Sequence, residues 1–143
     1  MKSLVAETPA ADSAAAAAHF AALLAFETDC WDVHVSLSEG RDDFVLLDVR
    51  SPDSYARGHI PGAINLPHGK IIASKLVAWP ADALFVVYCT GPHCNGADRG
   101  ALRLARLGRH VKKMIGGVSG WIDDGFALVS EPELGAPRSS DAA

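Results

Sequence analysis

The sequence predicts an α/β domain with a small central, mainly parallel sheet flanked by helices. Two short apolar runs, 44–48 (FVLLD) and 84–88 (LFVVY), are continuous rather than alternating, as is typical of strands buried on both faces of a parallel sheet. Stretches with helical spacing separate such runs, and this alternation indicates the fold class. The chain has 143 residues, 49% of them hydrophobic, which is enough for about one domain with one core.

The first residues, 1–28, are expected to form a helical extension. Residues 8–27 are dominated by alanine, the strongest helix former, and Phe20, Leu23 and Leu24 fall at positions i, i+3 and i+4. We predict a helix that docks on the domain through this narrow apolar stripe and covers one of its hydrophobic edges.

The domain itself is expected over residues 29–130. Its first helix begins after the acceptor side chain of Asp29 and stops near Gly40. The helix after the second apolar run begins at Asn95 and ends at Gly108. The remaining elements, in order, are a brief strand at 63–66, a short helix at 68–77, a strand at 111–115, a short helix at 118–125 and a polar C-terminal tail at 131–143.

Composition excludes several classes of protein. Three cysteines are too few and too irregularly spaced for a disulfide framework, so reduced thiols in a cytoplasmic protein are expected. Glu7, Pro9 and Asp12 interrupt the apolar region that a secretion signal requires, and no run reaches the roughly 18 apolar residues of a membrane span. A net charge of −4 without interleaved aromatic residues argues against nucleic-acid binding. We expect a monomer or a homodimer.

Basic residues are concentrated between positions 99 and 113, where no acidic residue occurs. Such a patch can steer a small anion or an acidic partner, although a solvated helix face has the same composition. The residues concerned are Arg99, Arg103, Arg106, Arg109, Lys112 and Lys113.

Cys89 is the candidate nucleophile. In the stretch VVYCTGPHCNGADRG it ends the second apolar run, and ligands of parallel sheets bind outside the carboxyl ends of the strands. A loop containing Gly91 then leads to a helix whose first amides are unpaired and whose positive end lowers the pKa of a thiol. A buried structural cysteine is the alternative.

The other two cysteines are assigned less directly. Cys94 lies five residues after Cys89 and could be a resolving thiol, a second sulfur site or a small residue that fills space. Cys30 lies within a predicted helix and is interpreted as structural. A zinc site would require further ligands, and only His93 is near, so we expect no metal and no cofactor.

Three segments resemble, in order, the signature segments of the rhodanese, or sulfurtransferase, family. They are LLDVRSPDSYARGHIPGAINLP at 46–67, VVYC at 86–89 and MIGGVSGWIDDGF at 114–126. The resemblance extends over about residues 29–130, and three ordered segments are far more specific than one short motif. It implies a small α/β domain with a central, mostly parallel sheet, in agreement with the pattern of elements.

The resemblance also implies a reaction. Cys89 matches the cysteine that attacks the sulfane sulfur of a small anionic donor such as thiosulfate, holds it as a persulfide and passes it to a thiol, cyanide or a protein acceptor. The backbone amides expected to surround the sulfur are those of Thr90, Gly91, His93, Cys94, Asn95 and Gly96.

The same resemblance assigns supporting roles to three residues, and the loop after Cys89 differs from that of many family members. Asp48 and Arg50 match the family's D-V-R and are expected to fix neighbouring loops, and His59 is expected to be a scaffold histidine. Many members have a shorter C-x-x-G-x-R-S loop, whereas here the helix begins about two residues later. Asn95 stands where a C-x5-R phosphatase or arsenate reductase requires an arginine clamp, so these activities are disfavoured.

Two alternatives to a sulfurtransferase remain. The domain could be a non-catalytic binding or regulatory module that keeps the fold, which a blocked Cys89 would favour. Cys89 and Cys94 could also cycle between dithiol and disulfide as a redox protein.

Overall fold

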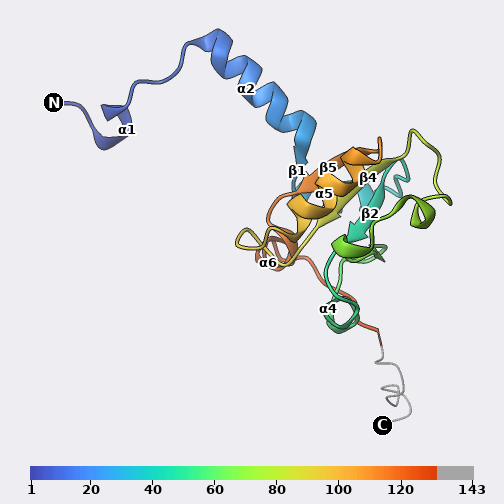
Figure 1. Ribbon diagram of the computed structural model, residues 1–143. Coiled ribbons are helices and arrows are strands. Elements are labelled where there is room, and N and C mark those ends of the chain that lie inside the picture. The colour runs from blue at the N-terminus through green and yellow to red at the C-terminus, as the bar shows by residue number, and fades with distance from the viewer. Residues whose placement is uncertain (132–143) are drawn as a thin grey trace.

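A five-stranded parallel sheet forms the centre of the domain (Figure 1). The computed structural model describes residues 1–131. The strand order is β1-β5-β4-β2-β3, which confirms the predicted fold class. The strands are β1 (Glu27–Thr28), β2 (Val45–Asp48), β3 (Ile64–Asn65), β4 (Leu84–Tyr88) and β5 (His110–Met114).

Helices flank the sheet, and two helices precede its first strand in the chain. They are α1 (Leu4–Glu7), α2 (Ser13–Phe26), α3 (Cys30–Ser38), α4 (Pro52–Arg57), α5 (Gly96–Arg106) and α6 (Gly117–Asp123), with single 3-10 turns η1 (His68–Lys70) and η2 (Ala73–Lys75). The predicted caps are confirmed for α3, where Asp29 accepts a hydrogen bond from the Asp32 amide at 2.8 Å and Gly40 follows the helix with φ of 69°.

The core has two parts, one on each face of the sheet, because successive side chains of a strand point to opposite faces. Val86 and Tyr88 of β4 face α3 and α6, where Trp121 is buried. Phe85 and Val87 face α5 instead. The two runs predicted as buried strands, β2 and β4, are neighbours in the middle of the sheet. This alternation determines on which face a residue that follows β4 will lie.

The single helix predicted over 68–77 is wrong, because two 3-10 turns lie there instead. Ile71 and Leu76 are 2% and 1% exposed in the core on the α5 face. In an α-helix, residues five apart would point about 140° away from each other. Breaking the segment into two turns allows both side chains to enter the same core.

The docking predicted for the N-terminal helix is also wrong. Helix α2 forms, capped by Asp12, but none of its residues is buried; Phe20 and Leu24 are 59% and 73% exposed. Figure 1 shows α2 projecting away from the sheet. A stripe surrounded by alanine offers little apolar area for docking. A hydrogen bond of 2.9 Å from Lys112 Nζ to the Leu24 carbonyl connects α2 to β5.

Strand β1 is an edge strand that the sequence patterns do not predict. It pairs Glu27 with Lys113 and Thr28 with Met114, and two residues are too few to show an apolar alternation. At the other end of the domain, the Glu131 amide donates to the Ala56 carbonyl at 2.8 Å. The rest of the predicted tail, 132–143, lies outside the described residues.

Candidate active site

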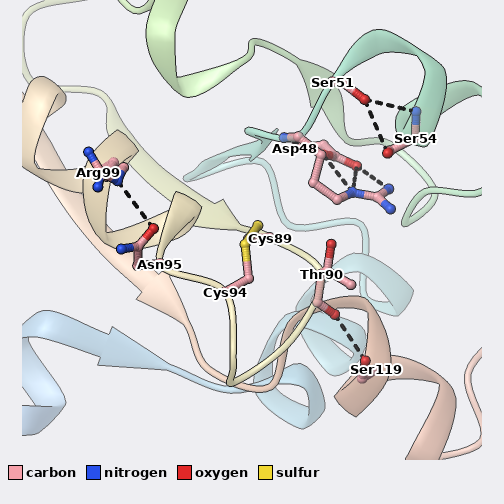
Figure 2. The surroundings of a disulfide bond; sticks show 10 residues. Asp48, Ser51, Ser54, Cys89, Thr90, Cys94, Asn95, Arg99 and Ser119 are labelled. Atoms are coloured by element: carbon pink, nitrogen blue, oxygen red, sulfur yellow. Dashed lines mark hydrogen bonds and ion pairs between the residues drawn. A yellow bond between two sulfur atoms is a disulfide. The ribbon is translucent and has the colours of Figure 1, made fainter.

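Cys89 directly follows β4, at the edge where the carboxyl ends of the parallel strands meet. Its side chain continues the alternation of β4 onto the face covered by α5 and is 6% exposed. The Cys89 carbonyl accepts a hydrogen bond from the Val118 amide at 3.0 Å. The Thr90 carbonyl accepts two from Ser119, from its amide at 2.8 Å and its hydroxyl at 3.1 Å (Figure 2). The start of α6 therefore fixes the position of Cys89.

A disulfide joins Cys89 to Cys94 across the loop between β4 and α5 (Figure 2). The Cys94 amide donates to the Gly91 carbonyl at 3.0 Å, which folds 91–94 into a tight turn. Cys94 is partly exposed, whereas Cys89 is buried. A role as a small residue that only fills space does not account for the disulfide that Cys94 forms with Cys89.

The turn corrects one part of the predicted amide cradle. The amide of Cys94 is already paired and does not face a ligand in this conformation. Asn95 lies at the start of α5 as predicted, but its side chain does not cap the helix; its Oδ1 accepts a hydrogen bond from Arg99 Nε at 3.2 Å. His93 is exposed and lines neither of the two cavities beside the disulfide.

Cavities flank the disulfide, and both cysteines line both of them. The first, of about 400 Å³, lies between the loop and the segments after β2 and β3. The second, of about 340 Å³, lies between the loop and the turn from β5 to α6 and includes Lys113. The first is lined by Val49, Arg50, Ser51, Pro67, His68, Gly69, Cys89, Thr90, Cys94, Asn95 and Gly96.

Gly96 brings the first turn of α5 against the sulfur atoms. A Cβ at this position would lie 2.8 Å from Cys89 Sγ and 3.5 Å from Cys94 Sγ. Only a residue without a side chain allows this approach. The positive end of an 11-residue helix thus faces both sulfurs and favours a thiolate there.

A basic cavity of about 490 Å³ adjoins this region and shares His68 and Gly69 with the cavity at Cys89. Arg99, Arg103 and Arg106 of α5 line it. Other members of the basic patch have structural partners. Arg109 donates to three carbonyls in residues 76–80, Lys112 holds α2, and Lys113 pairs with Asp98 at 3.0 Å.

Asp48 and Arg50 form a buried ion pair beside the site. Arg50 Nη2 lies 2.6 Å from Asp48 Oδ2, and Nε lies 3.0 Å from Oδ1. Arg50 Nη2 also donates to the Gly58 carbonyl at 2.6 Å, while the Asn65 amide group donates to the carbonyls of Asp48 and Arg50. Burial, the largest single influence, lowers the pKa of Arg50, but the hydrogen bonds and the negative charge of Asp48, with smaller contributions from Tyr88, together outweigh it and raise that pKa. The pair connects three loops around the site.

His59 is 4% exposed and lies away from the sulfur atoms, outside the cavities at the disulfide. Its Nδ1 donates to the Tyr55 carbonyl at 2.7 Å, and its ring stacks on that of Tyr55 at 3.7 Å. Its backbone exchanges two hydrogen bonds with Val129. These contacts are those expected of a scaffold histidine.

Sequence reasoning missed two residues that position the loop, Gly117 and Ser119. Gly117 has φ of 60° and lies against the backbone of residues 89–91, and Ser119 holds the Thr90 carbonyl. The signal for both residues in the sequence is the segment at 114–126, which contains them.

Cys30 is the free cysteine among residues 1–131 and is 3% exposed. Burial, with smaller contributions from the charges of Asp124 and Asp29, raises the pKa of its thiol to about 11. At about pH 8 only about one molecule in 10³ would therefore carry a Cys30 thiolate.

We expect iodoacetamide to label the reduced, folded protein at Cys89 and Cys94 but not at Cys30 near pH 8. Peptide mass mapping measures this directly, with protein unfolded in urea as the control in which all three cysteines react. Because the pKa is raised, labelling of Cys30 should increase only as the pH approaches 11. Equal labelling rates for Cys30 and Cys94 in the folded protein would contradict the structure.

Within residues 1–131, no cluster of three or more His, Cys, Asp or Glu side chains is arranged to hold a metal ion. In the same part of the chain, no helix combines the length and the apolar character needed to cross a bilayer.

Comparison with known proteins identifies relatives of this arrangement. The family model described as Rhodanese-like domain matches residues 32–124. Over 80 residues the chain is 41% identical to the HTH-type transcriptional regulator Rv0324 of Mycobacterium tuberculosis, a match that covers 55% of this chain and 34% of the regulator. Over 89 residues it is 30% identical to a sulfurtransferase of Allochromatium vinosum, covering 62% of this chain and 81% of that protein.

A solved structure extends the likeness to most of the chain. The BH2092 protein of Bacillus halodurans superimposes with a TM-score of 0.81 at 32% sequence identity, covering 83% of this chain and 87% of that one. The chain corresponds to only about a third of the length of the Mycobacterium tuberculosis regulator, so the likeness to that protein concerns one region of it.

Proposed function

The chain belongs to the rhodanese-like domain family, and we propose that it is a sulfurtransferase in which Cys89 carries the transferred sulfur. The observation that carries the proposal is the position of Cys89 Sγ against the first turn of α5, between two cavities. This position favours the thiolate and leaves room for a small donor. The sulfurtransferase relative supports the same class of reaction.

The reaction begins from the reduced protein, because Cys89 in the disulfide cannot attack. The Cys89 thiolate attacks the sulfane sulfur of a donor such as thiosulfate; a new S–S bond forms, the donor's S–S bond breaks and sulfite leaves. A thiol, cyanide or protein acceptor then takes the outer sulfur and regenerates the thiolate. The cavity lined by Arg99, Arg103 and Arg106 supports an anionic donor or an acidic acceptor protein, since positive charge raises the local concentration of anions. We place this thiol chemistry in the cytoplasm.

The supporting residues have positioning roles in this proposal. Asp48 and Arg50 hold the loops after β2 and β3 that form one wall of the cavity at Cys89, and His59 stabilises the scaffold behind them. The amides of Thr90, Gly91, His93, Asn95 and Gly96 supply the positive environment of the bound sulfur.

A second candidate is a regulatory module. The likeness to part of a transcriptional regulator, together with the low exposure of Cys89, favours a domain whose Cys89–Cys94 pair changes redox state without transferring sulfur. The two candidates differ in whether a sulfur atom is ever bound.

The test uses the Cys94→Ser variant, which cannot form the disulfide, so that sulfur bound to Cys89 is retained. After incubation with thiosulfate, we expect intact mass spectrometry to show a gain of one sulfur, about 32 Da. Thiocyanate formation with cyanide should fall at least about 10³-fold in the matched double variant Cys89→Ser, Cys94→Ser, because the nucleophile is lost. If no sulfane donor adds sulfur while Cys89 still reacts with an alkylating probe, the regulatory candidate replaces the sulfurtransferase.

A further inference from the structure

The position of Cys94 points to a second activity of the same site. We propose that Cys94 is a resolving cysteine that discharges the Cys89 persulfide as free sulfide, so that the protein reduces sulfane sulfur instead of only handing it on. This inference rests on the proposed function, because it requires that Cys89 first accept a sulfur atom. It gives Cys94 a catalytic role of its own.

The structure places Cys94 in bonding contact with the sulfur atom that it would attack. The disulfide forms while the loop keeps its backbone anchors, from the Cys94 amide to Gly91 and from Val118 and Ser119 to the start of the loop. The same conformation therefore holds Cys89 against α5 and Cys94 against Cys89. No other cysteine competes within residues 1–131, because Cys30 is buried on the opposite face of the sheet.

The step balances in atoms and electrons. The Cys94 thiolate attacks Cys89 Sγ, the inner sulfur of the persulfide; the Cys89–Cys94 bond forms, and the bond from Cys89 Sγ to the sulfane sulfur breaks. The sulfane sulfur leaves with the electron pair of that bond as hydrosulfide, taking up the proton released by the Cys94 thiol. The two cysteine sulfurs are oxidised to a disulfide, and the sulfane sulfur is reduced to sulfide.

Space for the leaving sulfur exists on either side of the disulfide. Cavities of about 400 and 340 Å³ are both lined by Cys89 and Cys94, so the sulfane sulfur can occupy one while Cys94 approaches. Lys113 also lines the smaller cavity, with its ammonium group paired to Asp98 at 3.0 Å.

Further turnovers require a reductant, which we assign to the class of small or protein dithiols. Its thiolate attacks Cys94 Sγ, because Cys94 is the more exposed partner, and Cys89 leaves as a thiolate. The α5 N-terminus, which approaches Cys89 Sγ through Gly96, favours that leaving group. The second thiol of the reductant then displaces Cys94, and the reductant is itself oxidised to a disulfide. Cys89 is thus returned in the form that accepts the next sulfur.

The experiment compares reduced wild type with Cys94→Ser in one turnover, without oxygen and without added thiol. With excess thiosulfate, the wild type should release about one sulfide per chain and finish about 2 Da lighter than the reduced protein, as a disulfide. Cys94→Ser should keep about 32 Da of added sulfur and release at least about ten times less sulfide. Sulfide is measured by derivatisation with monobromobimane, and mass by intact-protein spectrometry.

A Cys30→Ser variant is the matched control, because it removes the third thiol of residues 1–131 but keeps a donor for the Ile115 and Gly117 carbonyls, which Cys30 Sγ contacts at 3.5 and 3.6 Å. It should behave as the wild type. If the wild type instead keeps the added sulfur and releases no sulfide, the role of Cys94 is overturned while the sulfurtransferase proposal stands. Sulfide release from Cys94→Ser at the rate of the wild type would also overturn it. If Cys94→Ser gains no sulfur and the wild type releases no sulfide, the proposed function fails, and the role of Cys94 fails with it.

Discussion

Replacing Arg50 with methionine is expected to lower the free energy of unfolding by about 3–5 kcal/mol. Asp48 is fully buried, and its carboxylate accepts hydrogen bonds from the Arg50 backbone amide, Nε and Nη2. Methionine keeps much of the volume of the side chain but removes the charge and the guanidinium donors. A buried carboxylate that loses its partner keeps the full cost of its desolvation. Urea unfolding followed by tryptophan fluorescence, with the disulfide intact in all variants, measures the loss.

Two further variants separate this effect from the loss of any positive charge. Arg57→Met, in α4, removes an exposed arginine and should change stability by no more than about 0.5 kcal/mol. Adding Asp48→Asn to Arg50→Met should recover part of the loss, because the neutral amide costs less to bury. If Arg50→Met and Arg57→Met were equally stable, the buried pair would not hold the loops as the structure indicates.

The central strands of the sheet and the position of Cys89 at its carboxyl edge were predictable from the sequence. Continuous apolar runs occur where a strand is covered on both faces, so β2 and β4 carry a signal that does not depend on distant residues. Cys89 follows β4 directly, and the rule that ligands bind at the carboxyl ends of parallel strands places it at the site. Both inferences need only local patterns and the order of the elements.

What could not be predicted depends on contacts between segments far apart in the chain. From the sequence, the Cys94 amide is expected to be free to contact a ligand, but in the folded loop it donates a hydrogen bond to the Gly91 carbonyl. Helix α2 has an apolar stripe, but whether the stripe docks depends on the direction that the following strand, β1, gives the helix. The sequence of β1 is too short to show an apolar alternation that would predict this strand. Gly117 resembles an ordinary turn glycine until the fold brings it against the active-site loop.

Replacing Gly117 with alanine is expected to cost about 2–5 kcal/mol and to lower sulfur loading of Cys89. Gly117 has φ of 60°, where an L-residue pays about 1–2 kcal/mol, and overpacking a closed contact adds about 1–3 kcal/mol. The new Cβ would lie 2.5 Å from the Cys89 carbonyl oxygen and 2.9 Å from the Gly91 nitrogen. Both are backbone atoms, so relief of the contact must move the loop that carries Cys89.

Gly125→Ala is the matched control, because it separates the backbone strain from the contact. Gly125 also has positive φ, 86°, but no atom lies within 4 Å of its Cβ position. We expect this variant to lose only the conformational part, about 1–2 kcal/mol, and to load sulfur as the wild type does. Equal losses of stability and equal loading in the two variants would mean that the loop yields to the added methyl group at no cost. A selective effect of Gly117→Ala on loading would instead show that the turn from β5 to α6 positions Cys89 through its backbone.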